Sequence, residues 1–169
     1  LQDQHFGLEF GHETRDEQAA YDTLVEGEAE LISQRYLDRW CEEWSCLRPA
    51  LVTGGIDGER STLEPGIRLV LTQPYVQGRE FVDRVESTDG WEAVNALHDD
   101  PPLSTAAVIA PDRPVDSAPE TIEIPGRSTD GWERFDHQPT GETLGVASIY
   151  SMFAANEIIA ADEPGTYSH

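Results

Sequence analysis

The chain has 169 residues, of which 33 are acidic and 11 basic, and its formal net charge at pH 7 is -22. This length is enough for a single domain with a buried core. The apolar fraction of 38% is too high for a disordered acidic tail. The strong negative charge also argues against nucleic-acid binding, which requires a basic surface.

All 11 basic residues are arginine, and the chain contains no lysine. Acidic, lysine-poor surfaces resemble those of proteins from extreme halophiles, which stay hydrated in concentrated salt. In dilute buffer the same charges would repel one another and loosen the compact state. We therefore expect a halophilic protein whose acidity reflects its solvent.

The clearest predicted helix begins near Thr14 and ends near Trp40. Thr14 and Glu17 have the spacing of a capping box, which satisfies free amides at a helix start. An apolar stripe follows at helical spacing and predicts the face that packs on the core. Its members are Tyr21, Val25, Ala29, Ile32, Tyr36 and Trp40, widened by Leu24 and Leu31.

Within this helix, the stretch LVEGEAEL places Gly27 among three glutamates. Glycine costs about 1 kcal/mol relative to alanine inside a helix, so a packing reason is expected. Glu26 adjoins the predicted stripe, and a buried carboxylate needs a hydrogen-bond partner or a metal. Gly27 would let another helix approach closely. The simpler alternative is that Glu26, Glu28 and Glu30 form a hydrated face.

Further helices are expected along residues 67–85, 89–97 and 101–109, after a loop over residues 51–66. Pro74 predicts a break or kink, with a fresh helix beginning there. The third of these helices should be capped by Ser104 or Thr105.

The proline-rich segment 110–139 predicts loops with a small β element around residues 118–137, and an apolar core helix follows in 140–160. The expected fold class is mainly α (α+β), a helical bundle in one domain, 1–169. Its first two parts are 1–48, which carries the long helix, and 49–109, which is helical.

Cys41 and Cys46 stand alone as a Cys-x4-Cys pair, which makes a poor zinc site but leaves a disulfide or two buried thiols open. Five histidines are scattered along the chain, and none forms H-E-x-x-H; isolated histidines are usually surface or satisfied core groups. No apolar run is long enough to span a membrane, and no signal peptide is evident. The chain begins without Met, and both ends look cut from a longer protein.

The opening LQDQHF, followed by a helix with LVEGEAEL, resembles a zincin-like (gluzincin-type) metallopeptidase family of bacterial and haloarchaeal surface proteins. In that family H-E-x-x-H-A precedes LQDQHF, and the next helix carries ALxEGDA. Three later segments follow in the same order, over most of residues 1–157. They are LTQPYVQGREFVDRV, DGWEAVNALHDDPPLST and GETLG, which resemble the family's PY-x-x-G-x-x-F-V, GGW-x-x-V…PP-x-ST and DTLGE.

The resemblance implies roles for two glutamates. In such enzymes two histidines of H-E-x-x-H bind zinc, its glutamate activates the metal-bound water, and a glutamate of the next helix is the third protein ligand. Glu26 occupies this third-ligand position. Glu28 replaces the family's following aspartate and would orient a histidine. The family also implies a secreted or anchored cell-surface protein acting on a peptide substrate, which would favour a Cys41–Cys46 disulfide.

The chain departs from the family in one decisive respect. Both histidine ligands and the general base would lie before Leu1, in an upstream segment that acts as the partner of this one. We therefore expect no catalytic residue and no bound zinc in this chain alone, which should be inactive. Ala110 also stands where many relatives carry a histidine.

Two alternatives remain open from the sequence. One is a non-catalytic, degenerate zincin-like domain that serves a structural or binding purpose at the cell surface. The other is a metal site within the chain, formed by His5, His12 and Glu26. The sequence names neither a substrate nor an oligomeric state.

Overall fold

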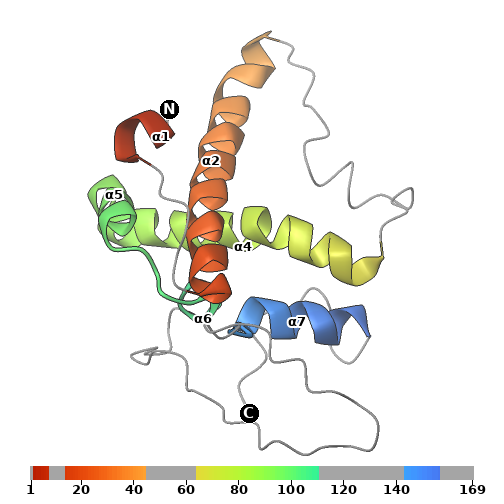
Figure 1. Ribbon diagram of the computed structural model, residues 1–169. Coiled ribbons are helices and arrows are strands. Elements are labelled where there is room, and N and C mark those ends of the chain that lie inside the picture. Colours follow the sequence, from red (N-terminus) through yellow and green to blue (C-terminus); the bar gives the residue numbers. More distant parts are fainter. Residues whose placement is uncertain (1, 8–13, 45–63, 111–142, 157–169) are drawn as a thin grey trace, which may run out of the picture.

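The computed structural model describes residues 2–7, 14–44, 64–110 and 143–156. Within these ranges the chain is mostly helical and contains no strand, which confirms the mainly α fold class. The β element expected around residues 118–137 lies outside them. The helices are α1 (Gln2–Phe6), α2 (Arg15–Trp44), α4 (Pro65–Asp89), α5 (Trp91–Asp99), α6 (Thr105–Ile109) and α7 (Val146–Ala155) (Figure 1).

The two long helices, α2 and α4, cross each other and form the largest interface among the described helices (Figure 1). α5 follows α4 at one end of this crossing. α1 lies beside α2 and α5 and contacts both through Gln2 and Phe6. α6 lies at the start of α2, and α7 packs along α4. Among the described residues, no helix is both long and apolar enough to cross a membrane.

The crossing of α2 and α4 depends on Gly27 and Gly78. A Cβ at Gly27 would overlap the backbone of Gly78, and a Cβ at Gly78 would overlap the carbonyl oxygen of Thr23. The two backbones therefore touch without side chains between them. Gly27 does provide the clearance that its position predicts, and the helix it admits is α4.

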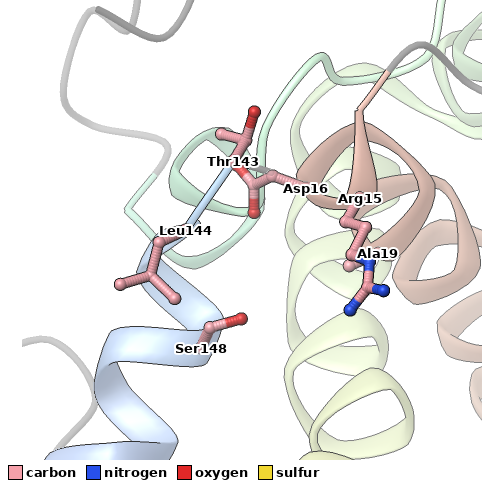
Figure 2. Close-up of a pocket in the computed structure, with 6 residues that line it drawn as sticks. All are labelled: Arg15, Asp16, Ala19, Thr143, Leu144 and Ser148. Carbon is pink, nitrogen blue, oxygen red and sulfur yellow. The ribbon is translucent and has the colours of Figure 1, made fainter. Parts of the chain in front are cut away.

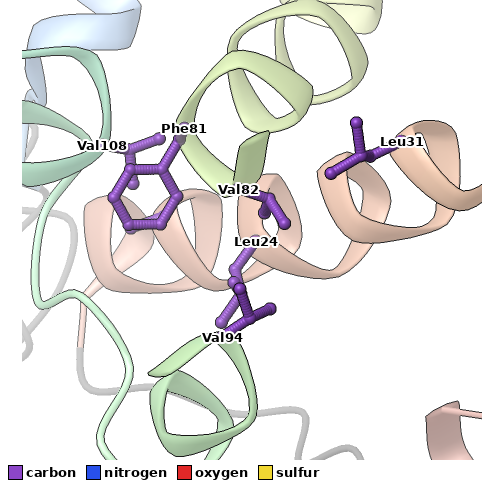
Figure 3. Close-up of a cluster of buried hydrophobic side chains, with 7 residues drawn as sticks. Leu24, Leu31, Phe81, Val82, Val94 and Val108 are labelled. Atoms are coloured by element: carbon purple, nitrogen blue, oxygen red, sulfur yellow. The ribbon is translucent and has the colours of Figure 1, made fainter. Parts of the chain in front are cut away.

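This crossing decides which face of α2 is buried. Ala20, Leu24 and Leu31 lie one or two turns from Gly27 on the same face, and all three are buried. The stripe predicted from the sequence is confirmed in part: Tyr21, Leu24 and Leu31 are buried, but Ile32 and Tyr36 are 48% and 52% exposed, so the real core face is rotated toward Leu24 and Leu31. The apolar core comprises Ala20, Leu24, Leu31, Phe81, Val82, Val94 and Val108, contributed by α2, α4, α5 and α6 (Figure 3).

The start of α2 agrees with the sequence. The amide of Glu17 donates to the hydroxyl of Thr14 at 3.1 Å, and the amide of Thr14 donates to the carboxylate of Glu17 at 3.1 Å. These reciprocal bonds are the predicted capping box. Ser104 likewise caps α6, because its hydroxyl accepts a bond from the amide of Ala107 at 3.4 Å.

Of the break or kink predicted at Pro74, the break is wrong, because α4 continues through this residue. Proline removes one helical hydrogen bond and costs about 3 kcal/mol inside a helix. Buried residues lie on both sides of it: Gln73 just before, then Gln77 and Gly78 one turn later. The packing of both halves against neighbouring helices offsets the lost bond.

The C-terminal helix is only partly the core helix that its apolar sequence predicts. Tyr150, Ser151 and Ala154 of α7 are buried, and Ser151 lies 3.4 Å from the side-chain oxygen of Gln73 on α4. Met152 and Phe153, on the other face, are exposed. α7 therefore covers α4 from outside and is not enclosed by the described helices.

Replacing Gly27 by alanine is expected to destabilise the fold by about 1–3 kcal/mol, because the added methyl forces α2 and α4 apart. The better helix propensity of alanine, about 1 kcal/mol, does not compensate. Denaturant unfolding in concentrated KCl, followed by circular dichroism, measures the change. Gly66→Ala is the matched control, since its Cβ would meet only the Ala155 methyl carbon at 3.0 Å. Equal stability of Gly27→Ala and the wild type would contradict the close crossing.

Candidate functional site

The buried glutamate of the LVEGEAEL stretch is Glu28, not Glu26. Glu28 is 5% exposed, whereas Glu26 and Glu30 are half-buried. Glu28 follows Leu24 by one turn and precedes Leu31 by less than one, so it lies on the face that the crossing buries. The sequence predicts Glu26 as the buried carboxylate because the apolar stripe is placed too far around the helix.

Glu28 is held by side chains from two other helices. Its Oε2 atom lies 2.8 Å from Nε2 of His98, in the last turn of α5, and accepts a bond from the Gln2 amide of α1 at 2.7 Å. The side chains of Glu28 and His98 are 7% and 1% exposed. A carboxylate at this depth is tolerated because it is hydrogen-bonded.

α1 covers this pair with two residues of one face. The ring of Phe6 stacks on the imidazole of His98, with centroids 3.9 Å apart and planes 8° apart. Gln2, one turn earlier on α1, also donates to the carbonyl oxygen of Val25 at 3.2 Å. Gln2, Phe6, Glu28 and His98 therefore form a cluster, here called the Glu28–His98 cluster, that joins α1, α2 and α5.

Opposing effects act on the pKa of Glu28. Burial raises it, but the hydrogen bonds with His98 and Gln2 and the electrostatic attraction of His98 together outweigh burial. The pKa of Glu28 therefore lies below its ordinary value of 4.5, and the carboxylate is ionised at neutral pH. Nδ1 of His98 is buried and has no hydrogen-bond partner among the described residues.

Glu26, the predicted zinc ligand, lies beside Tyr75 of α4. Burial raises the pKa of Tyr75 above 10.0, and the charge of Glu26 and a hydrogen bond to it raise it further. The phenol is therefore protonated at neutral pH, next to the Glu26 carboxylate. The charge of Glu30 acts on Tyr75 in the same direction.

The described residues do not bring the predicted metal ligands together. No group of three His, Cys, Asp or Glu side chains that could hold a metal occurs among them. His5 is exposed on α1 and packs edge-on against Phe6. His12 and Cys46 lie outside the described residues, as does the side chain of Cys41. The proposed His5–His12–Glu26 site and the disulfide therefore stay predictions.

His98 is the site residue that the sequence does not single out. It follows Val94 by one helical turn, so it lies on the buried face of α5, and that spacing is the one signal that could have found it. Its partner Glu28 is 70 residues away. The general expectation of a satisfied core histidine holds for Nε2, which contacts Glu28, but not for the buried Nδ1.

A second buried carboxylate, Asp16, joins the start of α2 to α6 and α7. It accepts bonds from the amide and hydroxyl of Thr105 at 3.2 and 2.6 Å, and that hydroxyl accepts from the amide of Ala147 at 3.0 Å. Gly145 leaves room for it, since a Cβ there would overlap the carboxylate. A hollow of about 300 Å³ opens beside Asp16 (Figure 2), lined by Arg15, Asp16, Ala19, Thr143, Leu144 and Ser148.

Asp16 therefore has a structural role, because it holds the start of α2 against α6 and α7. Its carboxylate is used by backbone and hydroxyl donors of Thr105, which leaves it poorly placed to act on a ligand in the hollow. The Glu28–His98 cluster and the adjoining Glu26 are the stronger candidate site.

Comparison of the chain with models of known protein families, with curated proteins and with solved structures finds no match in any of the three. The family resemblance of the motifs is therefore an expectation about function. The contacts around Glu26, Glu28 and His98 are the observations on which a functional proposal can be built.

Glu28→Gln is expected to reduce stability at pH 7 by about 1–3 kcal/mol, because a charge-assisted bond is lost in a buried position. Folding lowers the pKa of Glu28 from its ordinary value of 4.5. The stability that the ionised carboxylate contributes is therefore complete above pH 4.5, and it is lost as the pH falls through the pKa of the folded state. The difference in unfolding free energy between wild type and variant should therefore shrink below pH 4.5. Urea unfolding across pH 3 to 7 measures it; a difference independent of pH would contradict the assignment.

Proposed function

We propose that this chain is part of a zinc-dependent, peptidase-like surface protein, to which it supplies the third zinc ligand and the helices that support it. The third ligand is Glu26. The chain alone lacks the two histidines and the general base of such a site, so it is inactive by itself. Zinc binding then requires an upstream helix that carries H-E-x-x-H.

The observation that carries this proposal is the contact of Gln2 with α2. Gln2 bonds to Val25 and to Glu28, on either side of Glu26 in the sequence. If helical residues precede Gln2, those one and two turns earlier lie on the same face of that helix. In the pattern H-E-x-x-H-A-L-Q these two positions are the histidines, which would then lie beside the turn of α2 that carries Glu26.

The environment of Glu26 fits the role of a metal ligand. It is half-buried, so one side remains accessible, and its carboxylate is close enough to Tyr75 to raise the pKa of that phenol through charge and hydrogen bonding. Ligating carboxylates are commonly oriented by such hydrogen bonds. Zinc, when bound, would polarise the scissile carbonyl and lower the pKa of a bound water to about 7. The residues of this chain contribute ligand placement, not proton transfer.

The surface chemistry is consistent with a high-salt setting. A net charge of -22 without a single lysine leaves the protein with strong self-repulsion that concentrated salt screens. Secretion or anchoring of the protein is part of the same proposal, and its substrate class would be peptides.

The proposal is tested on a longer protein in which H-E-x-x-H precedes Leu1. We expect one equivalent of zinc per chain in concentrated KCl, and Glu26→Gln should weaken binding by more than the 10–100-fold typical of losing an outer supporting group. Glu30→Gln removes the same charge four residues further along α2 and should leave affinity within about twofold. Metal analysis and competition with a chelator provide the measurement.

Two results would reject the assignment. One is a longer protein that contains H-E-x-x-H but binds no zinc; the other is unchanged zinc affinity in Glu26→Gln. If the residues preceding Leu1 lack the two histidines, the non-catalytic binding or structural domain replaces the peptidase-like protein as the interpretation of this fold.

A further inference from the structure

We propose that His98 is a positioning residue: together with Glu28 it anchors α1 on α2 and α5, and so determines where a helix leading into Gln2 lies. The anchoring concerns contacts within this chain. Its consequence for a metal site rests on the proposed function above. Neither the family motifs nor the spacing of the histidines assigns this role to His98.

α1 cannot keep its position without external contacts. It has only five residues, and none of them is buried. Isolated helices of this length are not stable in water, because nucleation costs more than one turn of hydrogen bonds returns. In the described part of the chain, Gln2 and Phe6 make the hydrogen bonds and the ring contact that connect α1 to other helices. α1 therefore exists as a helix because these two residues are docked.

Both docking contacts lead to His98. The Phe6 ring stacks directly on its imidazole, and Gln2 bonds to the Glu28 oxygen that also contacts Nε2 of His98. Without the imidazole, Phe6 loses its stacking surface and Glu28 loses its most deeply buried partner. Glu28 would then turn toward water, where it no longer presents an oriented acceptor to Gln2.

The first part of the test uses this chain and two substitutions of His98. His98→Ala removes the ring and the donor, while His98→Gln keeps an amide donor near the position of Nε2 but removes the stacking surface. Asp99→Asn is the matched control, because the neighbouring Asp99 is exposed. Hydrogen exchange of residues 2–7 is measured in concentrated KCl, with residues 77–82 of α4 as a check that the fold is intact.

We expect the amides of Phe6 and Gly7 to exchange at least tenfold faster in His98→Ala than in wild type. The exchange rate in His98→Gln should lie between these two, and the rate in Asp99→Asn should equal that of wild type. Gly7 is a useful reporter because its amide donates to the carbonyl of Asp3 at 2.9 Å within α1. If protection of α1 is unchanged in both His98 variants while α4 stays protected, the anchoring role is overturned. If His98→Ala unfolds α4, the variant Phe6→Leu, which loses the ring that stacks on His98, is measured in its place. Unchanged exchange of the α1 amides in Phe6→Leu would equally overturn the anchoring role of His98.

The second part measures zinc affinity in the longer protein with H-E-x-x-H. Loss of a supporting group that orients metal ligands typically costs 10–100-fold in affinity, and we expect this for His98→Gln and not for Asp99→Asn. Faster α1 exchange with unchanged zinc affinity would overturn the positioning of the metal site. Failure of the wild-type longer protein to bind zinc would instead reject the proposed function, and the exchange result would still decide whether His98 anchors α1.

Discussion

The structure depends on the direct contact of two helix backbones at Gly27 and Gly78. This contact fixes the rotation of α2 about its own axis, because only the face that carries Gly27 can approach α4 so closely. The apolar residues Leu24 and Leu31 and the carboxylate of Glu28 then fall inside together. Glu26 is turned to the side of the crossing, where it meets Tyr75 of the same partner helix. One packing constraint therefore assigns different environments to glutamates only two residues apart.

Buried and surface carboxylates are treated differently in this acidic chain. Asp16 and Glu28 are buried and accept bonds from uncharged donors, Thr105 and Gln2, with His98 as the further partner of Glu28. On the surface, Arg35 of α2 bridges Asp83 and Glu86 of α4 at 2.9 and 2.8 Å. Such exposed pairs contribute little each and are screened by salt. In concentrated salt the buried networks are the electrostatic contacts that keep their strength.

Local features of the fold were predictable from the sequence, and those set by distant contacts were not. The capping box at Thr14, the Ser104 cap and the short helix after Gly90 follow from residues a few positions apart, and the structure has all three. The buried face of α2 was misplaced because apolar periodicity carries no information about a close glycine crossing. Pro74 likewise predicts a break that tertiary packing overrides.

The site shows the same division. Gly27 indicated a close helix approach, but its partner helix could not be named. Glu28 was expected to orient a zinc-binding histidine before Leu1, and in the structure it contacts His98, which the sequence did not single out. Glu28 and His98 are separated by 70 residues, and Asp16 and Thr105 by 89. No local pattern relates side chains so far apart, and only the fold brings them into contact.

The Oε2 atom of Glu28 is shared by α1 and α5, since Gln2 and His98 both contact this one oxygen. Two bonds to one atom are not independent, because a movement of the carboxylate that shortens one distance changes the other. The first helix of the chain and the last turn of α5 are therefore energetically coupled, although no backbone contact is needed between them. Fraying of α5 near His98 would therefore weaken the contacts that hold α1. The Oε2 atom of Glu28 couples these two helices, although they are far apart in the sequence.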